Sequence, residues 1–128
     1  MTHSEKSYNL RLYMAENGYY INPAPFGYSN SNYSLKINRR QAKIVRMMFD
    51  WKTENHLPSS LIVLELNRLG VKTKNGNKWS IFSVDYVLHN PVYIGKVRYD
   101  GMLFPGKHTP IISEEQFYKI NSHVNETE

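Results

Sequence analysis

The 128-residue sequence contains no cysteine, so disulfide bonds, thiolate zinc ligands and thiol catalysis are excluded for this chain. It also lacks any apolar run near the ~20 residues that a membrane-spanning helix requires, and no membrane partner is expected. Residues 1–8 lack the apolar core of a secretion signal, which favours a cytoplasmic protein. With 41% hydrophobic and 21% charged residues, the composition is ordinary for a globular domain.

Negative charge is scarce, and the positive excess is confined to one part of the chain. The formal net charge is +5, and residues 36–78 hold ten Lys or Arg side chains against three acidic ones. Residues 79–128 hold four basic and six acidic side chains. A local excess of this kind is what a phosphate-facing surface requires, because neutralised phosphates release their counterions. A solvated, lysine-rich helix face is the alternative explanation.

Five helices are predicted from apolar periodicity and from the residues at their ends. Ser80 suits an N-cap, the Asn38–Gln41 and Ser113–Gln116 pairs resemble capping boxes, and Gly70 suits the left-handed residue after a helix. The expected helices cover residues 5–17, 38–55, 59–69, 81–89 and 113–124. Their expected core side chains are Ala42, Val45, Met48, Phe49, Ile62, Val63, Leu66, Leu69, Val84, Val87, Leu88, Phe117, Ile120 and Val124.

A single β-hairpin is predicted between the last two helices. Asp100-Gly101 favours a type I′ turn, so strands over 93–99 and 102–104 should pair. Residues 19–33, rich in Pro, Asn and Ser, are expected to form an ordered loop. The fold class is therefore α+β and mostly helical, with a helix-turn-helix-like core, a wing-like C-terminal hairpin and a closing helix.

Helix 81–89 is the strongest candidate for contact with bases in a DNA groove. If its apolar stripe faces the core, its other side chains point outward to base edges. Basic residues nearby would hold phosphates, which fix register without specifying sequence. Phe82 is undecided between the core and contact with a thymine methyl group. The expected base contacts are Ser83, Asp85, Tyr86 and His89; the expected phosphate contacts are Arg39, Arg40, Lys43, Lys72, Lys74, Lys78, Lys96 and Arg98.

Catalytic and metal sites are not expected in this sequence. Ser59, Ser80 and Ser113 are explained more simply as helix caps than as nucleophiles. His89 and His108 suggest a metal-dependent nuclease, but a helix-terminal histidine stabilised by the helix dipole is the simpler explanation for His89. No cofactor or metal is predicted.

Six motifs follow one another in order over residues 14–124. They are the aromatic and proline segment 18–28, the helix positions Ala42, Val45 and Phe49, the Leu-Asn-Arg-Leu-Gly-Val-Lys-Thr segment 66–73, Trp79-Ser80 with Val84, the Asn-Pro-Val-Tyr-Ile-Gly-Lys segment 90–96, and the Ile-Ile-Ser-Glu-Glu-Gln-Phe segment 111–117. Together they resemble the recombinase domain of the large serine recombinases, the phage-integrase and transposase type. Phe26 stands where that family more often has Tyr.

This resemblance implies sequence-specific binding of duplex DNA at an attachment half-site, during integration, excision or transposition of mobile DNA. In that family a catalytic serine domain precedes this module and a cysteine-bearing zinc ribbon follows it, and neither is recognisable here. The chain itself is therefore expected not to be an enzyme, and to be either an excised piece or a remnant of a recombinase. A bacterial or phage-encoded, nucleoid-associated parent would act as a dimer or tetramer, and this fragment as a monomer.

The resemblance also sets the expected domain limits. Residues 1–18 would be the end of a linker helix or an arm, residues 19–124 the DNA-binding domain and residues 125–128 a frayed tail. Two other functions stay open at this point: a stand-alone winged-helix transcription regulator, and a small metal-dependent nuclease that uses the histidines.

Overall fold

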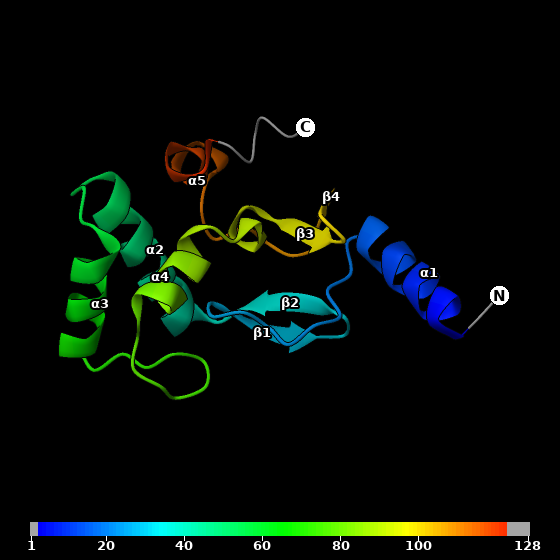
Figure 1. The fold of residues 1–128 in the computed structure, drawn as a ribbon, viewed down its shortest axis with the longest axis horizontal. Coiled ribbons are helices and arrows are strands. Elements are labelled where there is room, and N and C mark those ends of the chain that lie inside the picture. The colour runs from blue at the N-terminus through cyan, green and yellow to red at the C-terminus, as the bar shows by residue number, and fades with distance from the viewer. Residues whose placement is uncertain (1–2, 123–128) are drawn as a thin grey trace.

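The computed structural model describes residues 3–122, with side chains described from Glu5 onward. The elements are α1 (His3–Glu16), β1 (Tyr28–Ser31), β2 (Ser34–Ile37), α2 (Arg39–Thr53), α3 (Ser59–Arg68), α4 (Ile81–Leu88), the 3-10 helix η1 (Pro91–Ile94), β3 (Lys96–Tyr99), β4 (Met102–Pro105) and α5 (Glu114–Ile120). Two separate hairpins lie between α1 at one end and the cluster of α2, α3 and α4 at the other (Figure 1). None of the described helices is both long and apolar enough to cross a bilayer. The α+β, mostly helical class is confirmed.

The start of α2 is tied to the loop before it. The Asn38 side chain accepts a hydrogen bond from the Gln41 backbone N–H at 3.1 Å, so the predicted N-cap is confirmed. Gln41 does not complete a capping box, because its side-chain oxygen accepts the Gly27 N–H at 2.9 Å instead. The helix ends at Thr53, before the expected Asn55. Its predicted apolar stripe is buried against the rest of the core.

The helix α3 differs from its prediction at two points, its N-cap residue and the exposure of Leu69. Pro58 occupies the N-cap position and makes no side-chain cap, so the predicted cap by Ser59 is wrong. Ile62 and Leu66 are buried, but Leu69 is 46% exposed because it lies at the helix end, outside the packed stripe. The predicted ending at Gly70 is confirmed by its φ of +75° and by the hydrogen bond from Val71 N to Leu66 O at 3.1 Å.

A hairpin over residues 28–37 was not predicted from the sequence. β1 and β2 pair antiparallel, with Tyr28 opposite Ile37 and Ser31 opposite Ser34. Asn32 and Tyr33 both have positive φ, of 48° and 60°, which is the geometry of a two-residue type I′ turn. The Ser- and Asn-rich sequence hides these strands, because only Tyr28 and Leu35 are buried and no apolar alternation appears.

The second hairpin was predicted, with one error at its start. β3 and β4 pair antiparallel, and Asp100 and Gly101 have φ of 51° and 77°, so the expected turn is confirmed. The first strand begins at Lys96 rather than Tyr93, because Pro91–Ile94 forms a 3-10 turn whose residues are all buried. Asn90 caps this turn by accepting the Val92 N–H at 3.0 Å.

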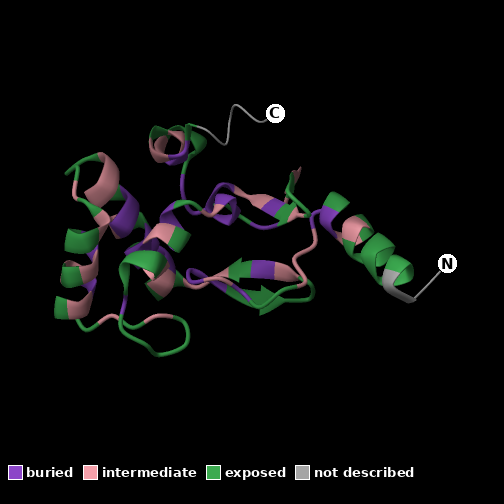
Figure 2. Cartoon of the chain, viewed as in Figure 1, coloured by how far each residue is buried: buried purple, intermediate pink, exposed green. Residues whose placement is uncertain are grey.

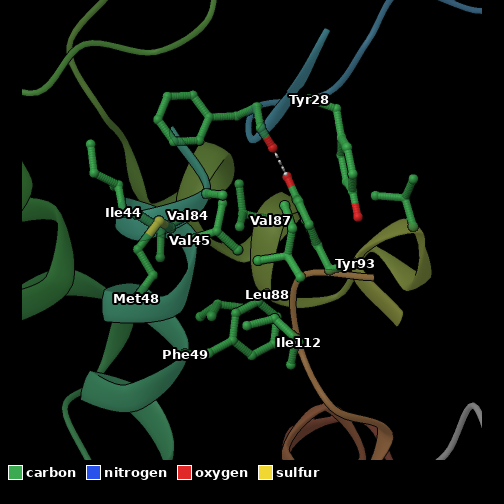
Figure 3. Close-up of a cluster of buried hydrophobic side chains, with 14 of the residues drawn as sticks. Tyr28, Ile44, Val45, Met48, Phe49, Val84, Val87, Leu88, Tyr93 and Ile112 are labelled. Atoms are coloured by element: carbon green, nitrogen blue, oxygen red, sulfur yellow. Dashed lines mark hydrogen bonds between the residues drawn. The ribbon is translucent and has the colours of Figure 1, made fainter. Parts of the chain in front are cut away.

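The core joins α2, α4, η1 and α5 to the first hairpin (Figure 2). Figure 3 shows Val45, Met48 and Phe49 of α2 packed among Val84, Val87 and Leu88 of α4. At its centre the buried rings of Tyr28 and Tyr93 stack with centroids 6.1 Å apart. Each phenol has a backbone partner: Tyr28 donates to Thr109 O at 2.7 Å, and Tyr93 donates to Phe26 O.

The closing helix α5 packs on α2. Ser113 accepts the Gln116 N–H at 3.1 Å, which confirms the N-cap. Gln116 reaches α2 rather than its own N-terminus, and donates to Asp50 Oδ1 at 2.7 Å. Phe117 is fully buried. The expected inward Val124 and the expected tail 125–128 lie outside the described residues.

Candidate functional site

The helix α4 presents two aromatic rings to solvent. Ser80 and Ser83 form a reciprocal capping box, with Ser83 Oγ accepting the Ser80 N–H at 2.8 Å. Val84, Val87 and Leu88 face the core as predicted. On the opposite side Phe82 is 79% exposed and Tyr86 62% exposed, and their rings stack with centroids 6.2 Å apart. Phe82 is therefore not a core residue.

Two of the four side chains expected to face outward from α4 are half-buried and hydrogen-bonded to neighbouring polar groups. Ser83 is half-buried, and its hydroxyl is used in the capping box. Asp85 is half-buried and accepts a hydrogen bond from the Ser59 hydroxyl of α3. These hydrogen bonds cap the start of α4 through Ser83 and join α4 to the start of α3 through Asp85, and contact of either side chain with DNA stays a prediction. Tyr86 and His89 are exposed, as predicted.

Tyr86 and His89 share a polar cleft of about 310 Å³ with the second hairpin. Lys96 and Arg98 also line it, and they lie on the same face of β3 because side chains alternate between the two faces of a strand. Its remaining polar wall is formed by Tyr20, Asn22 and Asn90. Burial raises the pKa of Tyr20 to about 12, so this phenol stays protonated at neutral pH. The structure thus brings four predicted site residues together.

A second, more apolar cleft of about 260 Å³ lies on the other side of Tyr86. Its apolar wall consists of Pro25, Phe26, Trp79, Phe82 and Val87, and the 73–75 loop forms its rim. Trp79 is buried and meets Phe26 edge-on at a centroid distance of 5.1 Å.

Two hydrogen-bonded side chains hold the wall and rim of this cleft. Asn67 clamps the Trp79 backbone, accepting its N–H at 3.0 Å and donating to its carbonyl at 3.2 Å. Lys74 has a partner that the sequence did not indicate: its ammonium donates to the Tyr28 carbonyl. Partial burial lowers the pKa of this lysine. Lys72 and Lys78 are exposed on the same loop and line neither cleft.

Four further cations gather in an open groove of about 880 Å³ between α2 and the first hairpin. Lys36 comes from β2, while Arg39, Lys43 and Arg46 follow one another along a single face of α2. No carboxylate lines this groove. Arg40 is exposed but points outside it. We call this feature the basic groove.

Eight of the twelve predicted DNA contacts therefore divide between two surfaces. The first, which we call the α4 surface, consists of Lys74, Phe82, Ser83, Tyr86, His89, Lys96 and Arg98. The stacked Tyr28–Tyr93 pair lies between the two surfaces: Tyr93 lines the apolar cleft, while Tyr28 is bonded to Thr109, which lines the basic groove. The sequence did not indicate this separation.

The two histidines considered for nuclease chemistry lie in different places. His89 lines the polar cleft, and its Nδ1 lies 2.8 Å from the Asp85 carbonyl. His108 is buried against the Tyr28 ring, with Nε2 2.8 Å from the Val92 carbonyl, and burial lowers its pKa. Within residues 3–122, no three His, Asp or Glu side chains gather where they could hold a metal ion.

Sequence reasoning missed several side chains of these surfaces. Arg46 continues the series of Arg39 and Lys43 at helical spacing, so periodicity could have found it. Lys36 lies on a strand that was not predicted. Tyr20 and Asn22 precede that strand, and only the packing of their loop beside α4 brings them to the polar cleft.

Comparisons with known proteins agree on one family. The Recombinase family model matches residues 39–127. The "Putative DNA recombinase" of Bacillus subtilis (strain 168) is 33% identical over an alignment of 102 residues, and the match covers 73% of this chain and 20% of that protein. The chain thus spans about a fifth of the length of this curated relative.

Two solved structures share the fold. One is described as "Sequence Requirements of the Listeria innocua prophage attP site" and the other as "Crystal Structure of a LSR-DNA Complex", where LSR denotes a large serine recombinase. Each is 29% identical with a TM-score of 0.78 over 94% of this chain, which covers 51% of the first and 39% of the second. The chain therefore belongs to the Recombinase family and carries the recombinase domain of the large serine recombinases.

Proposed function

We propose that this domain binds duplex DNA at one half of a recombination attachment site and places α4 in the major groove. The observation that carries the proposal is the position of Tyr86 between two clefts, with Lys74 at one rim and Lys96 and Arg98 in the other. A groove of DNA presents base edges flanked by two phosphate backbones. An exposed aromatic helix flanked on both sides by cations is complementary to that pattern.

The remaining cations supply contacts with the backbone. Lys72 and Lys78 extend the cationic rim of the α4 surface along the 72–78 loop. Arg39, Arg40 and Lys43 place further positive charge near the N-terminus of α2, where the helix dipole also favours an anion. These contacts would raise affinity for any duplex and would not distinguish one sequence from another.

The chain would act as a DNA-holding part of a site-specific recombinase that integrates, excises or transposes mobile DNA. Strand cleavage would belong to another part of the parent protein, which would assemble as a dimer or tetramer on DNA at the bacterial nucleoid. The isolated domain would be a monomer. The family match and the DNA complex among its structural neighbours support this role.

A salt titration tests DNA binding directly. With roughly three to six phosphates neutralised, log affinity should fall against log salt with a slope of about −3 to −5. The measurement is fluorescence anisotropy of a labelled duplex at four or more salt concentrations. Absence of binding at low salt, or a slope near zero, contradicts the proposal.

A plasmid assay tests where the chemistry resides. Purified domain is incubated with supercoiled plasmid, with and without magnesium or zinc, and the expected result is no nicking. Metal-dependent nicking that disappears in His89→Ala would instead assign a nuclease activity to the polar cleft.

A further inference from the structure

Phe82 is an exposed aromatic residue whose side chain does not contribute to the hydrophobic core. At 79% exposure it is the most exposed large apolar side chain among those described, and its ring contacts Tyr86 of the same helix. An isolated exposed phenylalanine is unremarkable. This one adjoins an apolar cleft whose wall is held rigidly by the Asn67 clamp on Trp79 and by the Phe26 ring. The apolar side chains there are pre-arranged for contact with a ligand.

The charges around the cleft restrict what that ligand can be. Lys74 lies at the rim, Lys72 and Lys78 lie on the same loop, and no carboxylate lines the cleft. Beyond Tyr86, Lys96 and Arg98 line the neighbouring polar cleft. An apolar contact bordered on both sides by cations fits a polyanion with an apolar edge. Duplex DNA has one such edge in its major groove, the 5-methyl group of thymine.

The position of Phe82 on α4 fits the same contact. It lies in the first turn, one residue after the start of the helix at Ile81. The N-terminal residues of a recognition helix are those that reach base edges when the helix lies in the major groove. The capping box fixes this turn, so the ring is presented from a rigid backbone.

We propose that Phe82, supported by Tyr86 and the apolar cleft, recognises the 5-methyl group of a thymine in the bound half-site. This inference rests on the proposed DNA binding and adds a specificity-determining residue to it. Phe82 would favour thymine over cytosine through apolar contact alone, without a hydrogen bond. The methyl group would contact the Phe82 ring on one side and the Tyr86 ring on the other.

The test replaces thymine by uracil, which removes only the methyl group. A duplex is first enriched from a random library with the wild-type domain, and each thymine of the enriched sequence is then replaced singly by deoxyuridine. At one or two positions the wild-type domain should bind about fourfold more weakly, the effect of losing one methyl from an apolar contact. Phe82→Ala should bind the thymine and uracil duplexes equally, whereas Phe82→Leu should retain most of the preference.

Ile81→Ala is the matched control, because Ile81 is 53% exposed on the same turn but does not line the cleft. It should keep the full thymine preference. Wild-type binding that ignores every uracil substitution, or Phe82→Ala that keeps the preference, overturns the inference and leaves DNA binding intact. Loss of folding in Phe82→Ala, seen by circular dichroism, also overturns it, since the ring would then be structural. Failure of the wild-type domain to bind any duplex refutes the proposed function itself.

Discussion

The α4 surface and the basic groove differ in composition although both are rich in cations. The α4 surface sets two exposed aromatic rings between cations that come from a loop and from a strand. The basic groove has four cations, no aromatic ring and no carboxylate in its lining. Aromatic and polar side chains can distinguish base edges, whereas cations alone respond to phosphate, which is the same at every position. The contrast separates a surface suited to sequence recognition from one suited to general attraction.

The largest expected effect comes from neutralising the basic groove. Replacing Arg39, Lys43 and Arg46 together by Gln should weaken binding to any duplex by roughly ten- to a hundredfold at moderate salt, because about three counterion-releasing contacts are lost. The salt slope should become shallower by about two to three. Affinity is measured by anisotropy on an enriched duplex and on a scrambled one.

A control with the same net charge distinguishes groove contacts from overall attraction. Lys6, Lys52 and Lys119 line neither surface, and their joint replacement by Gln removes the same three charges. This control should lose far less affinity. Equal losses in both triple variants would remove the basic groove from the DNA interface, and a loss confined to the enriched duplex would make the groove a recognition surface.

Tyr86→Ala should have the next largest effect, and only on the enriched sequence. Loss of a base-edge contact costs roughly 1–3 kcal/mol on a specific site and almost nothing on scrambled DNA. The variant should fold normally because Tyr86 is 62% exposed. The measurement is the ratio of the two affinities. An equal loss on both duplexes would place Tyr86 among the residues that only hold phosphate.

Lys74→Ala should have a smaller effect that concerns both DNA and stability. It should weaken binding to both duplexes alike and lower the salt slope by about one. Because the ammonium also donates to the Tyr28 carbonyl, the substitution should lower the free energy of unfolding by about 1 kcal/mol. Lys72→Ala removes the same charge from the same loop and should leave the melting temperature unchanged. A melting temperature of Lys74→Ala equal to that of the wild type would show that its bond with Tyr28 contributes nothing to stability.

The smallest expected effect on DNA binding comes from His108, a buried side chain whose protonation affects stability instead. Burial lowers the pKa of His108, so the folded state binds a proton less readily than the unfolded state. Its contribution to stability is therefore complete above the ordinary histidine pKa of about 6.5 and is lost as the pH falls below it, by at most about 1.4 kcal/mol per pH unit. The free energy of unfolding from urea titrations between pH 5 and 8 checks this. His108→Gln should flatten the profile, and His56→Asn, at an exposed position with positive φ, should not.

The two hairpins show how far local sequence can predict structure. The second hairpin was predicted because Asp100-Gly101 specifies its turn through two residues alone. The first was missed because its turn, Asn32-Tyr33, places an unusual tyrosine at positive φ and its strands expose most of their side chains. The stability of this first hairpin depends on Tyr28, whose ring packs against Tyr93, 65 positions later in the chain. Nothing in residues 28–37 indicates that partner.

The candidate site shows the same division. Tyr86 and His89 were predicted from helical periodicity, and Lys96 and Arg98 as basic residues near that helix. The structure places all four in one cleft. Asp85 and Ser83 were assigned to the outer face of α4 by the same periodicity, but each is half-buried and makes a hydrogen bond, Asp85 with Ser59 and Ser83 with Ser80. Helical periodicity gives the direction of a side chain from its own helix axis and does not indicate which neighbouring element covers that direction.

Local sequence was sufficient to predict the helix caps at Asn38, Ser80 and Ser113, the left-handed end at Gly70 and the turn at Asp100-Gly101. Each of these depends on the conformational preferences of a few adjacent residues. The bond from Lys74 to Tyr28 and the division of most predicted cations between two surfaces became visible only in the folded protein. These outcomes depend on contacts between segments far apart in the chain, such as the bond from Lys74 to the Tyr28 carbonyl and the stacking of Tyr28 on Tyr93, and no local sequence pattern indicates such contacts.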